Sequence, residues 1–291
     1  IHRHADSMAR AAAATLRLTG LPSAAVPFDL SVEAEALGAD VEFPAPSSLE
    51  FPRIVSPRIT QDDSTLKAFQ IPAGDVRRLG RVDTVCRAIT QLRTDIGSEA
   101  VIGGVLAGPF TVLSMLIENS ILFQWMKREP EIVLEFLLQT ASFISQVGRA
   151  YHESGADFLT VHEMGGSPDV LGARRFEYFV LPSLKNLLAN LPAPSVLAVC
   201  GNLEKIAPLL EGTDAEALSI DQSNNLRTLR MALPHSLLFG NINPLDILAQ
   251  GNPEEVAEAV RRAISLGVDA VWPGCDLQLN TPPENVRSLA G

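Results

Sequence analysis

Residues 252–276 read NPEEVAEAVRRAISLGVDAVWPGCD, and in this stretch a helix leads directly into a strand. Asn252 is a typical N-cap residue, Pro253 suits the first helical position, and Gly267 suits the position just past the helix end. Residues 269–272 then have the length and composition of a buried strand. A helix that feeds a strand in this way is typical of parallel strands linked by helices.

The same alternation of short β-type runs with longer helical patterns begins near residue 100. Strands are expected at residues 24–28, 101–106, 157–161, 195–199, 217–220, 236–239 and 269–272. These strands approach the eight of a closed barrel, so we predict an α/β fold of the (β/α)8 TIM-barrel class. An open doubly wound sheet is the alternative. Residues 40–70 contain several prolines and little periodicity, which predicts a long loop or lid.

The length of 291 residues suits a single barrel domain that spans residues 1–291. The chain begins with Ile1 rather than methionine, which allows for a trimmed chain that lacks N-terminal elements of the barrel. A formal net charge of −11 leaves no broad cationic surface, so neither nucleic acid nor a membrane is an expected partner. The short apolar runs and the absence of a secretory signal pattern predict a cytoplasmic protein.

Thiol and imidazole side chains come directly after three of the expected strands. His162 follows one strand, Cys200 follows the next, and Cys275 follows the last. In parallel α/β architectures the carboxyl ends of the strands share one face, and that face carries the active site. Two thiols and an imidazole on one face match a zinc site with three protein ligands and an open position.

More polar residues lie at the same strand ends. Glu163, next to His162, suits a fourth ligand, a partner of a ligand or a general base, and its alternative role is a solvated loop carboxylate. Asp221 and Asn241 follow two further strands and are candidates for contact with a substrate. Asparagine in such a place is as typical of a turn, so both interpretations stay open.

Each cysteine also has a structural interpretation, because cysteine is among the residues most often buried as inert packing. Cys86 fits that role, since it lies in the helical pattern RVDTVCRAITQLR. Three cysteines, widely spaced, do not suggest a disulfide framework, and we expect reduced thiols.

Several segments resemble a known protein family. FGNINPLDIL at residues 239–248 and the whole of residues 252–289 are similar to the C-terminal third of the uroporphyrinogen decarboxylase superfamily. VCGN at residues 199–202, PGCD at residues 273–276 and the run at residues 4–43 resemble its branch of cobamide-dependent methyltransferases. This resemblance implies a TIM barrel of that superfamily over nearly the whole chain.

The decarboxylase members are the less similar branch. They usually carry a Gly-His-Gly type sequence where this chain has Pro273-Gly274-Cys275. They also use an arginine-rich N-terminal motif for the carboxylates of the substrate, and nothing before residue 50 resembles it. A decarboxylase of this type is therefore the alternative function.

In the methyltransferase branch, zinc is held by a His-x-Cys motif and a distant cysteine. The resemblance places these cysteines at Cys200 and Cys275, whereas Ala198 occupies the place of the histidine. Two cysteines alone would bind zinc poorly, so another donor has to replace the histidine. We predict that His162 is this relocated ligand and that Glu163 completes the coordination when no substrate is bound.

The resemblance implies that the enzyme transfers a methyl group from a methylated corrinoid, carried by a partner corrinoid protein, to a small-molecule thiol or similar acceptor. Zinc would hold the acceptor as a thiolate. Asp221 and Asn241 would orient the acceptor. A barrel that binds a corrinoid or its carrier protein without catalysis is a third interpretation.

Overall fold

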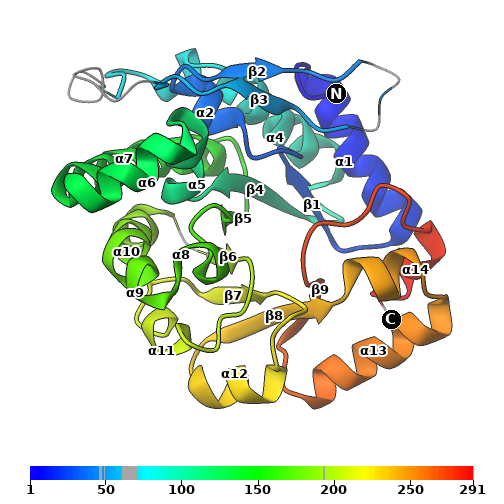
Figure 1. The fold of residues 1–291 in the computed structure, drawn as a ribbon. Helices are drawn as coiled ribbons and strands as arrows, with labels where there is room; N and C mark the ends of the chain where they lie inside the picture. Colours follow the sequence, from blue (N-terminus) through cyan, green and yellow to red (C-terminus); the bar gives the residue numbers. More distant parts are fainter. Residues whose placement is uncertain (46–47, 49, 61–70, 193, 291) are drawn as a thin grey trace.

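The computed structural model describes residues 1–45, 48, 50–60, 71–192 and 194–290 (Figure 1). Seven parallel strands form one curved sheet in the order β1-β4-β5-β6-β7-β8-β9. Their bounds are β1 Ser23–Val26, β4 Val101–Ala107, β5 Phe158–Glu163, β6 Ser195–Val199, β7 Ala217–Ile220, β8 Leu237–Ile242 and β9 Ala270–Pro273. Each expected strand is present, and the α/β-barrel class is confirmed.

The sheet grows by one strand at a time in the order of the sequence, because a helical connection returns the chain to the same edge of the sheet. β6 is buried along its whole length, as expected for a parallel strand covered on both faces. β1 and β9 are the two edge strands, and the described part of the chain contains no ladder that joins them. The sheet is thus a barrel wall of seven strands.

Helices surround the outside of this sheet (Figure 1). They are α1 Ala5–Thr19, α2 Val32–Ala36, α4 Val82–Ile96, α5 Pro109–Leu116, α6 Asn119–Arg128, α7 Pro130–Glu153, α8 Pro168–Leu171, α9 Ala173–Arg175, α10 Leu181–Asn190, α11 Ala207–Leu210, α12 Leu226–Ala232, α13 Pro253–Ser265 and α14 Pro283–Arg287. Short 3-10 or π turns lie at Val76–Arg78, Phe176–Val180 and Pro244–Ala249. Among the described residues, no helix combines the length and the apolarity that crossing a bilayer requires.

The predicted caps of α13 are confirmed. The side chain of Asn252 accepts hydrogen bonds from the backbone N–H groups of Glu254 and Glu255, and the Glu255 carboxylate accepts one from the Asn252 backbone. This reciprocal capping box fixes the start of α13. It therefore sets where the chain turns back toward β9.

The prediction of a loop over residues 40–70 is wrong in part. β2 Asp40–Glu42 pairs antiparallel with β3 Arg53–Ser56, and Arg53 forms an ion pair with Glu42 across the two strands. Strands of three and four residues are too short to show an alternating pattern, which is why their periodicity was invisible in the sequence. Residues 46–47, 49 and 61–70 of this predicted loop lie outside the described residues.

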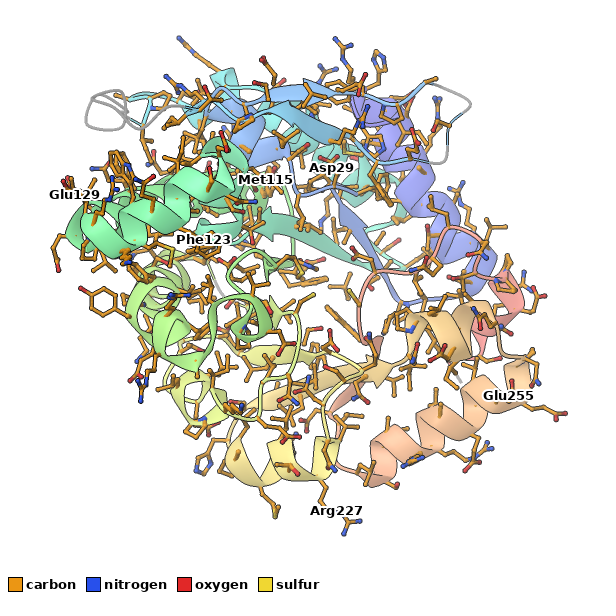
Figure 2. The ribbon with its side chains drawn as sticks, in the orientation of Figure 1. Asp29, Met115, Phe123, Glu129, Arg227 and Glu255 are labelled. Carbon is orange, nitrogen blue, oxygen red and sulfur yellow. The ribbon has the colours of Figure 1, made fainter. Side chains whose placement is uncertain are left out.

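A buried ion pair ties the segment after β1 to the start of α4. The Arg81 guanidinium donates to both carboxylate oxygens of Asp29, at 3.1 and 2.9 Å, and their side chains are only 5% and 3% exposed. Asp29 lies beneath β2 and β3 (Figure 2). Burial by itself would raise the pKa of Asp29, but hydrogen bonds from His2 and Arg81 outweigh it and lower the pKa.

We expect Arg81→Ala to lower the free energy of unfolding by about 3–5 kcal/mol, because the substitution leaves a buried carboxylate without its cation. Urea denaturation measures this change. The matched control is Arg10→Ala, since Arg10 pairs with Asp6 where both side chains are 68% exposed, and a change below about 1 kcal/mol is expected there. Equal losses in the two variants would contradict the prediction.

The same ion pair predicts a pH dependence. The folded state lowers the pKa of Asp29, so the contribution of Asp29 to stability is present above its unfolded pKa of about 3.9 and is lost as the pH falls below that value. Asp29→Asn should therefore lose less stability than the wild type between about pH 5 and pH 2. Thermal unfolding across that range measures the difference.

Candidate active site

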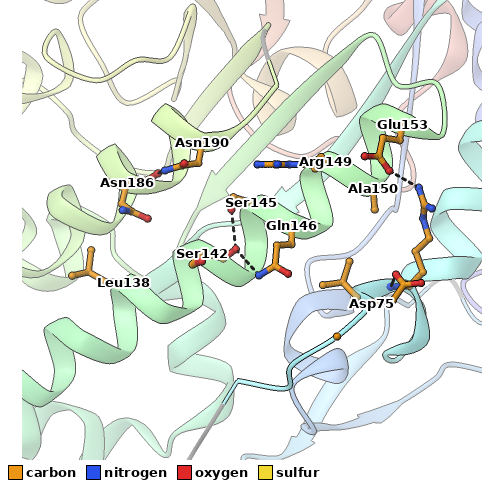
Figure 3. A pocket seen from close by; sticks show the side chains of 13 residues that line it. Asp75, Leu138, Ser142, Ser145, Gln146, Arg149, Ala150, Glu153, Asn186 and Asn190 are labelled. Atoms are coloured by element: carbon orange, nitrogen blue, oxygen red, sulfur yellow. Dashed lines mark hydrogen bonds and ion pairs between the residues drawn. The ribbon is translucent and has the colours of Figure 1, made fainter.

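Hollows of different kinds lie on this barrel. A groove of about 680 Å³ runs over the outer surface between α7 and α10, and Figure 3 shows the polar side chains that line it, among them Gln146, Arg149 and Asn186. A smaller pocket of about 220 Å³ lies at the carboxyl ends of β5, β6, β7 and β9. Catalytic residues of barrel enzymes come from that edge of the sheet, so the smaller pocket is the candidate site.

We name this hollow the strand-end pocket. Its lining comes from the strand ends and from the loops that follow them: His162, Met164, Ala198, Val199, Cys200, Ser219, Asp221, Trp272, Pro273, Gly274, Cys275, Asp276 and Leu277. The predicted residues His162, Cys200, Cys275 and Asp221 are all in this set. Sequence reasoning missed Met164, Ser219, Trp272 and Asp276 as lining residues. Met164 and Asp276 directly follow predicted residues, Ser219 lies two places before Asp221, and Trp272 ends an expected strand three places before Cys275, and these positions were the signal available for finding them.

The two cysteines meet although 75 residues and two strands separate them. Cys200 follows β6 and Cys275 follows β9, and their Sγ atoms are 3.9 Å apart. The curvature of the sheet brings these two strand ends toward one another. Cys200 Sγ also lies 2.8 Å from the thioether Sδ of Met164. Cys86, in contrast, is buried in α4, as its structural interpretation predicted.

A hydrogen bond between the two thiols shifts their pKa values in opposite directions. Donation from Cys200 to Cys275 raises the pKa of Cys200, and burial raises it further. The same hydrogen bond lowers the pKa of Cys275 to about 7, with help from the backbone N–H of Asp276 and against the effect of burial. Cys275 is therefore the member of the pair that carries the thiolate first.

His162 reaches the pocket from the strand next to that of Cys200. His162 on β5 is in register with Ala198 on β6, so the imidazole lines the same side of the sheet as Ala198. Its Nε2 atom lies 3.0 Å from Thr160 Oγ1, and no group in the described part of the chain hydrogen bonds to Nδ1. Burial lowers the pKa of His162, and the negative charge of Asp276 acts in the opposite direction. The lowered pKa favours the neutral imidazole.

Glu163 lies on the opposite side of β5, because successive side chains of a strand alternate. Its carboxylate accepts hydrogen bonds from the backbone N–H groups of Phe110, Thr111 and Gly166 and from the Thr111 hydroxyl. Burial raises the pKa of Glu163, and these hydrogen bonds act against that rise. The prediction that Glu163 completes the metal coordination does not fit this position. We infer that it orders the start of α5 instead.

The two other predicted substrate contacts differ in their positions. Asp221 lines the pocket, and its carboxylate accepts hydrogen bonds from the backbone N–H groups of Gly201 and Ser223. Asn241 is not among the residues that line this pocket, and its amide donates instead to the backbone oxygens of Asp221 and Asn224 at 3.4 and 3.3 Å. We infer that Asn241 supports the loop that presents Asp221.

No three His, Cys, Asp or Glu side chains of the described residues are gathered closely enough to enclose a metal ion. Cys200 and Cys275 lie beside one another, and no third side chain of these kinds joins them among the described residues. The roles of His162, Cys200 and Cys275 as zinc ligands therefore stay predictions.

In metal-free protein we expect iodoacetamide to alkylate Cys275 faster than Cys200, with a half-maximal rate near pH 7, because the thiolate is the reactive form. Cys200→Ala removes the hydrogen-bond donor and should move that midpoint toward about 8.5. Mass spectrometry of the labelled peptides across a pH series measures both values. Cys86→Ala is the control that leaves the midpoint unchanged, and equal labelling of Cys200 and Cys275 near pH 7 would refute the assignment.

The chain is similar to known methyltransferases over its whole length. The methylcobamide:CoM methyltransferase MtbA of Methanosarcina acetivorans is 28% identical over 99% of this chain and 84% of that protein. The methylated-thiol–coenzyme M methyltransferase of Methanosarcina mazei is 27% identical over 98% of this chain and 76% of that protein. The solved structure of a methyltransferase from Methanosarcina mazei matches 99% of this chain and 85% of its own with a TM-score of 0.93 and 25% identity.

These relatives confirm the resemblance to the methyltransferase branch. The family described as uroporphyrinogen decarboxylase (URO-D) matches residues 1–290. The strand-end pocket thus lies at the edge of the sheet where barrel enzymes carry their active sites, and the chain belongs to the URO-D family.

Proposed function

We propose that this chain is a zinc-dependent methyltransferase that moves a methyl group from a methylated corrinoid to a thiol or similar acceptor. The observation that carries the proposal is the 3.9 Å separation of Cys200 Sγ and Cys275 Sγ at the active-site edge of the barrel. The relatives named methylcobamide:CoM methyltransferases and methylated-thiol–coenzyme M methyltransferase support the type of reaction.

The two sulfurs fit zinc. Zinc–sulfur bonds of about 2.3 Å at tetrahedral angles separate two sulfur ligands by about 3.8 Å. The observed separation of 3.9 Å is close to this value, so the cysteines need little movement to become ligands. The lowered pKa of Cys275, about 7, also favours the thiolate that a metal binds.

His162 is the proposed third ligand. Its register with Ala198 places the imidazole beside the position from which the usual histidine is missing. Donation from Nε2 to the Thr160 hydroxyl would leave the lone pair on Nδ1 free for a metal, which is the arrangement found around many histidine ligands. Because no third zinc donor is gathered around the sulfurs among the described residues, His162 and the two cysteines would have to move closer together to share a metal.

When bound, zinc would hold the acceptor thiol in an open position as a thiolate. The acceptor sulfur then forms a bond to the methyl carbon while the cobalt–carbon bond breaks, and the electron pair of that bond stays with cobalt, which goes from Co(III) to Co(I). The chain aligns the sulfur with the methyl group and excludes water from the pocket. Asp221, held by two backbone N–H groups, lies where it can orient the acceptor.

The size of the pocket fits a corrinoid that stays outside it and presents its methyl group at the mouth. A volume of about 220 Å³ accommodates a small acceptor but not a corrinoid macrocycle. The corrinoid would therefore approach the mouth of the pocket from outside while its carrier contacts the rim of the barrel.

The decarboxylase alternative receives no support from the charges in the pocket. A substrate with several carboxylates needs cationic partners, and no lysine or arginine is present among the lining residues of the strand-end pocket. Asp221 and Asp276 would repel such a substrate instead.

We expect uroporphyrinogen to release no carbon dioxide when it is incubated with the protein, and release would favour the decarboxylase.

Metal content tests the ligands. Protein purified without added metal should contain about one zinc per chain by elemental analysis, and Cys200→Ser or Cys275→Ser should remove most of it. His162→Ala should weaken zinc binding by about 10- to 100-fold in a competition with a chelator, and adding Ala198→His to this variant should restore it. The Cys86→Ser control keeps its zinc. Unchanged affinity in His162→Ala would exclude the relocated ligand.

Methyl transfer tests the reaction. With methylcobalamin and a thiol in excess, the absorbance of the cobalamin should change as the methyl group leaves cobalt. Cys200→Ser and Cys275→Ser should lower kcat/KM by about 100-fold or more, whereas Cys86→Ser should not. Binding of the corrinoid without methyl transfer to any thiol would support the non-catalytic interpretation instead.

A further inference from the structure

Three sulfur atoms lie together in the strand-end pocket. Cys200 Sγ is 3.9 Å from Cys275 Sγ and 2.8 Å from the thioether Sδ of Met164. All three residues line the pocket. The proposed zinc ligands give Met164 no role, although its sulfur lies directly against that of Cys200.

Backbone hydrogen bonds hold two of these three residues in place. The backbone N–H of Met164 donates to the Thr111 hydroxyl at 2.8 Å. The backbone N–H of Gly274, which precedes Cys275, donates to the backbone oxygen of Ile242 at the end of β8. The sulfurs therefore converge from segments that are anchored to the barrel wall.

A thioether distinguishes one class of metal from another. Zinc in proteins is bound by thiolate, imidazole and carboxylate ligands. Thiolate and thioether sulfurs are soft ligands, and together they select copper(I). A methionine is more often a filler of apolar space, but Met164 is only half-buried and lies in an open pocket beside two thiols.

The spacing of the cysteines suits a metal that is bound by three sulfurs. Metal–sulfur bonds of about 2.3 Å in a trigonal plane separate the sulfurs by about 4.0 Å. Cys200 Sγ and Cys275 Sγ, at 3.9 Å, already have this separation. Met164 Sδ would move about 1 Å away from Cys200 Sγ to reach it. The flexible, unbranched methionine side chain allows such a movement.

The surroundings of the sulfurs suit a metal of low charge. Apolar side chains contribute to the remaining lining, among them Val199, Pro273 and Leu277. An apolar shell limits the access of water and disfavours higher charge, so it stabilises a monovalent ion relative to a divalent one. Cys275 is exposed, which gives an ion a path from the solvent.

We propose that Cys200, Cys275 and Met164 bind copper(I) through their three sulfur atoms. The two cysteines bind as thiolates, and the protons of their thiols go to the solvent. The inference goes beyond the proposed function, since it requires neither zinc nor a methyl donor. For that function the consequence is a competition, because copper(I) and zinc would share the same two cysteines.

X-ray absorption at the copper edge identifies the ligands directly. The protein is produced with selenomethionine, freed of metal with a chelator and loaded with copper(I) in the absence of oxygen. We expect one selenium and two sulfur neighbours of copper, because Met164 is the methionine among the lining residues of the pocket. The selenium neighbour should disappear in Met164→Leu, which keeps the apolar volume of the side chain.

Competition with bathocuproine disulfonate measures the affinity for copper(I). Met164→Leu should lower it by at least about 10-fold, the loss that removal of a mere outer partner of a ligand already causes. Zinc affinity should stay unchanged in this variant, because a thioether is not a usual zinc ligand. Met164→Cys, with a third thiolate, should restore copper(I) binding.

Two further variants serve as controls for the copper(I) affinity. Met115→Leu changes a methionine of α5 that is not among the lining residues, and it should keep the wild-type affinity for both metals. His162→Ala removes the proposed third zinc ligand and should leave copper(I) binding intact.

Two results at copper would overturn the inference. One is a nitrogen neighbour in place of selenium, and the other is equal copper(I) affinity of the wild type and Met164→Leu. A parallel loss of zinc and copper(I) in Met164→Leu would also contradict it, since Met164 would then only pack the pocket. The proposed function fails on different results, namely a wild-type protein that binds no zinc or transfers no methyl group.

Discussion

The parallel register of one curved sheet is the constraint on which the candidate site depends. Parallel strands end at the same edge, and the curvature of the sheet turns the ends of β6 and β9 toward each other. Cys200 and Cys275 follow these ends, and their sulfurs lie 3.9 Å apart without any covalent bond between them. A flat sheet of the same strand order would hold them farther apart, because β7 and β8 lie between.

The alternation of side chains along β5 gives neighbouring residues different tasks. His162 faces the pocket, whereas Glu163 faces the other side and is surrounded by four hydrogen-bond donors, three of them backbone N–H groups. Three of these donors belong to the start of α5, where a carboxylate is stabilised by the positive end of the helix. The strand thereby contributes one side chain to the lining of the pocket and one to the anchoring of a helix that follows another strand.

Two nearly buried carboxylates of this chain, Asp29 and Asp221, also differ in the groups that surround them. Asp29 is buried and neutralised by Arg81, so its charge serves the packing of β1 against α4. Asp221 is also nearly buried, but its carboxylate accepts hydrogen bonds from the backbone N–H groups of Gly201 and Ser223 at the rim of the strand-end pocket.

Much of this architecture could be predicted from the sequence. The spacing of caps, helices and strands predicted all seven barrel strands, because each short buried run of a parallel sheet is apolar and is bounded by turn residues. The position of Cys200, Cys275 and His162 after strands was also sufficient to place them at one edge. The hairpin of β2 and β3 was not predictable, since its strands are too short to show a pattern.

The sequence by itself thus determined the order of the strands, the edge at which the site lies and the family of the chain. Only the tertiary structure decided which polar side chains enter the pocket. Glu163 was removed from the site by the alternation of β5, and Asn241 was placed behind Asp221 as a support for its loop. The physical reason is that the direction of a side chain at a strand end depends on the exact register and on the path of the loop, and these are set by contacts between residues far apart in the sequence.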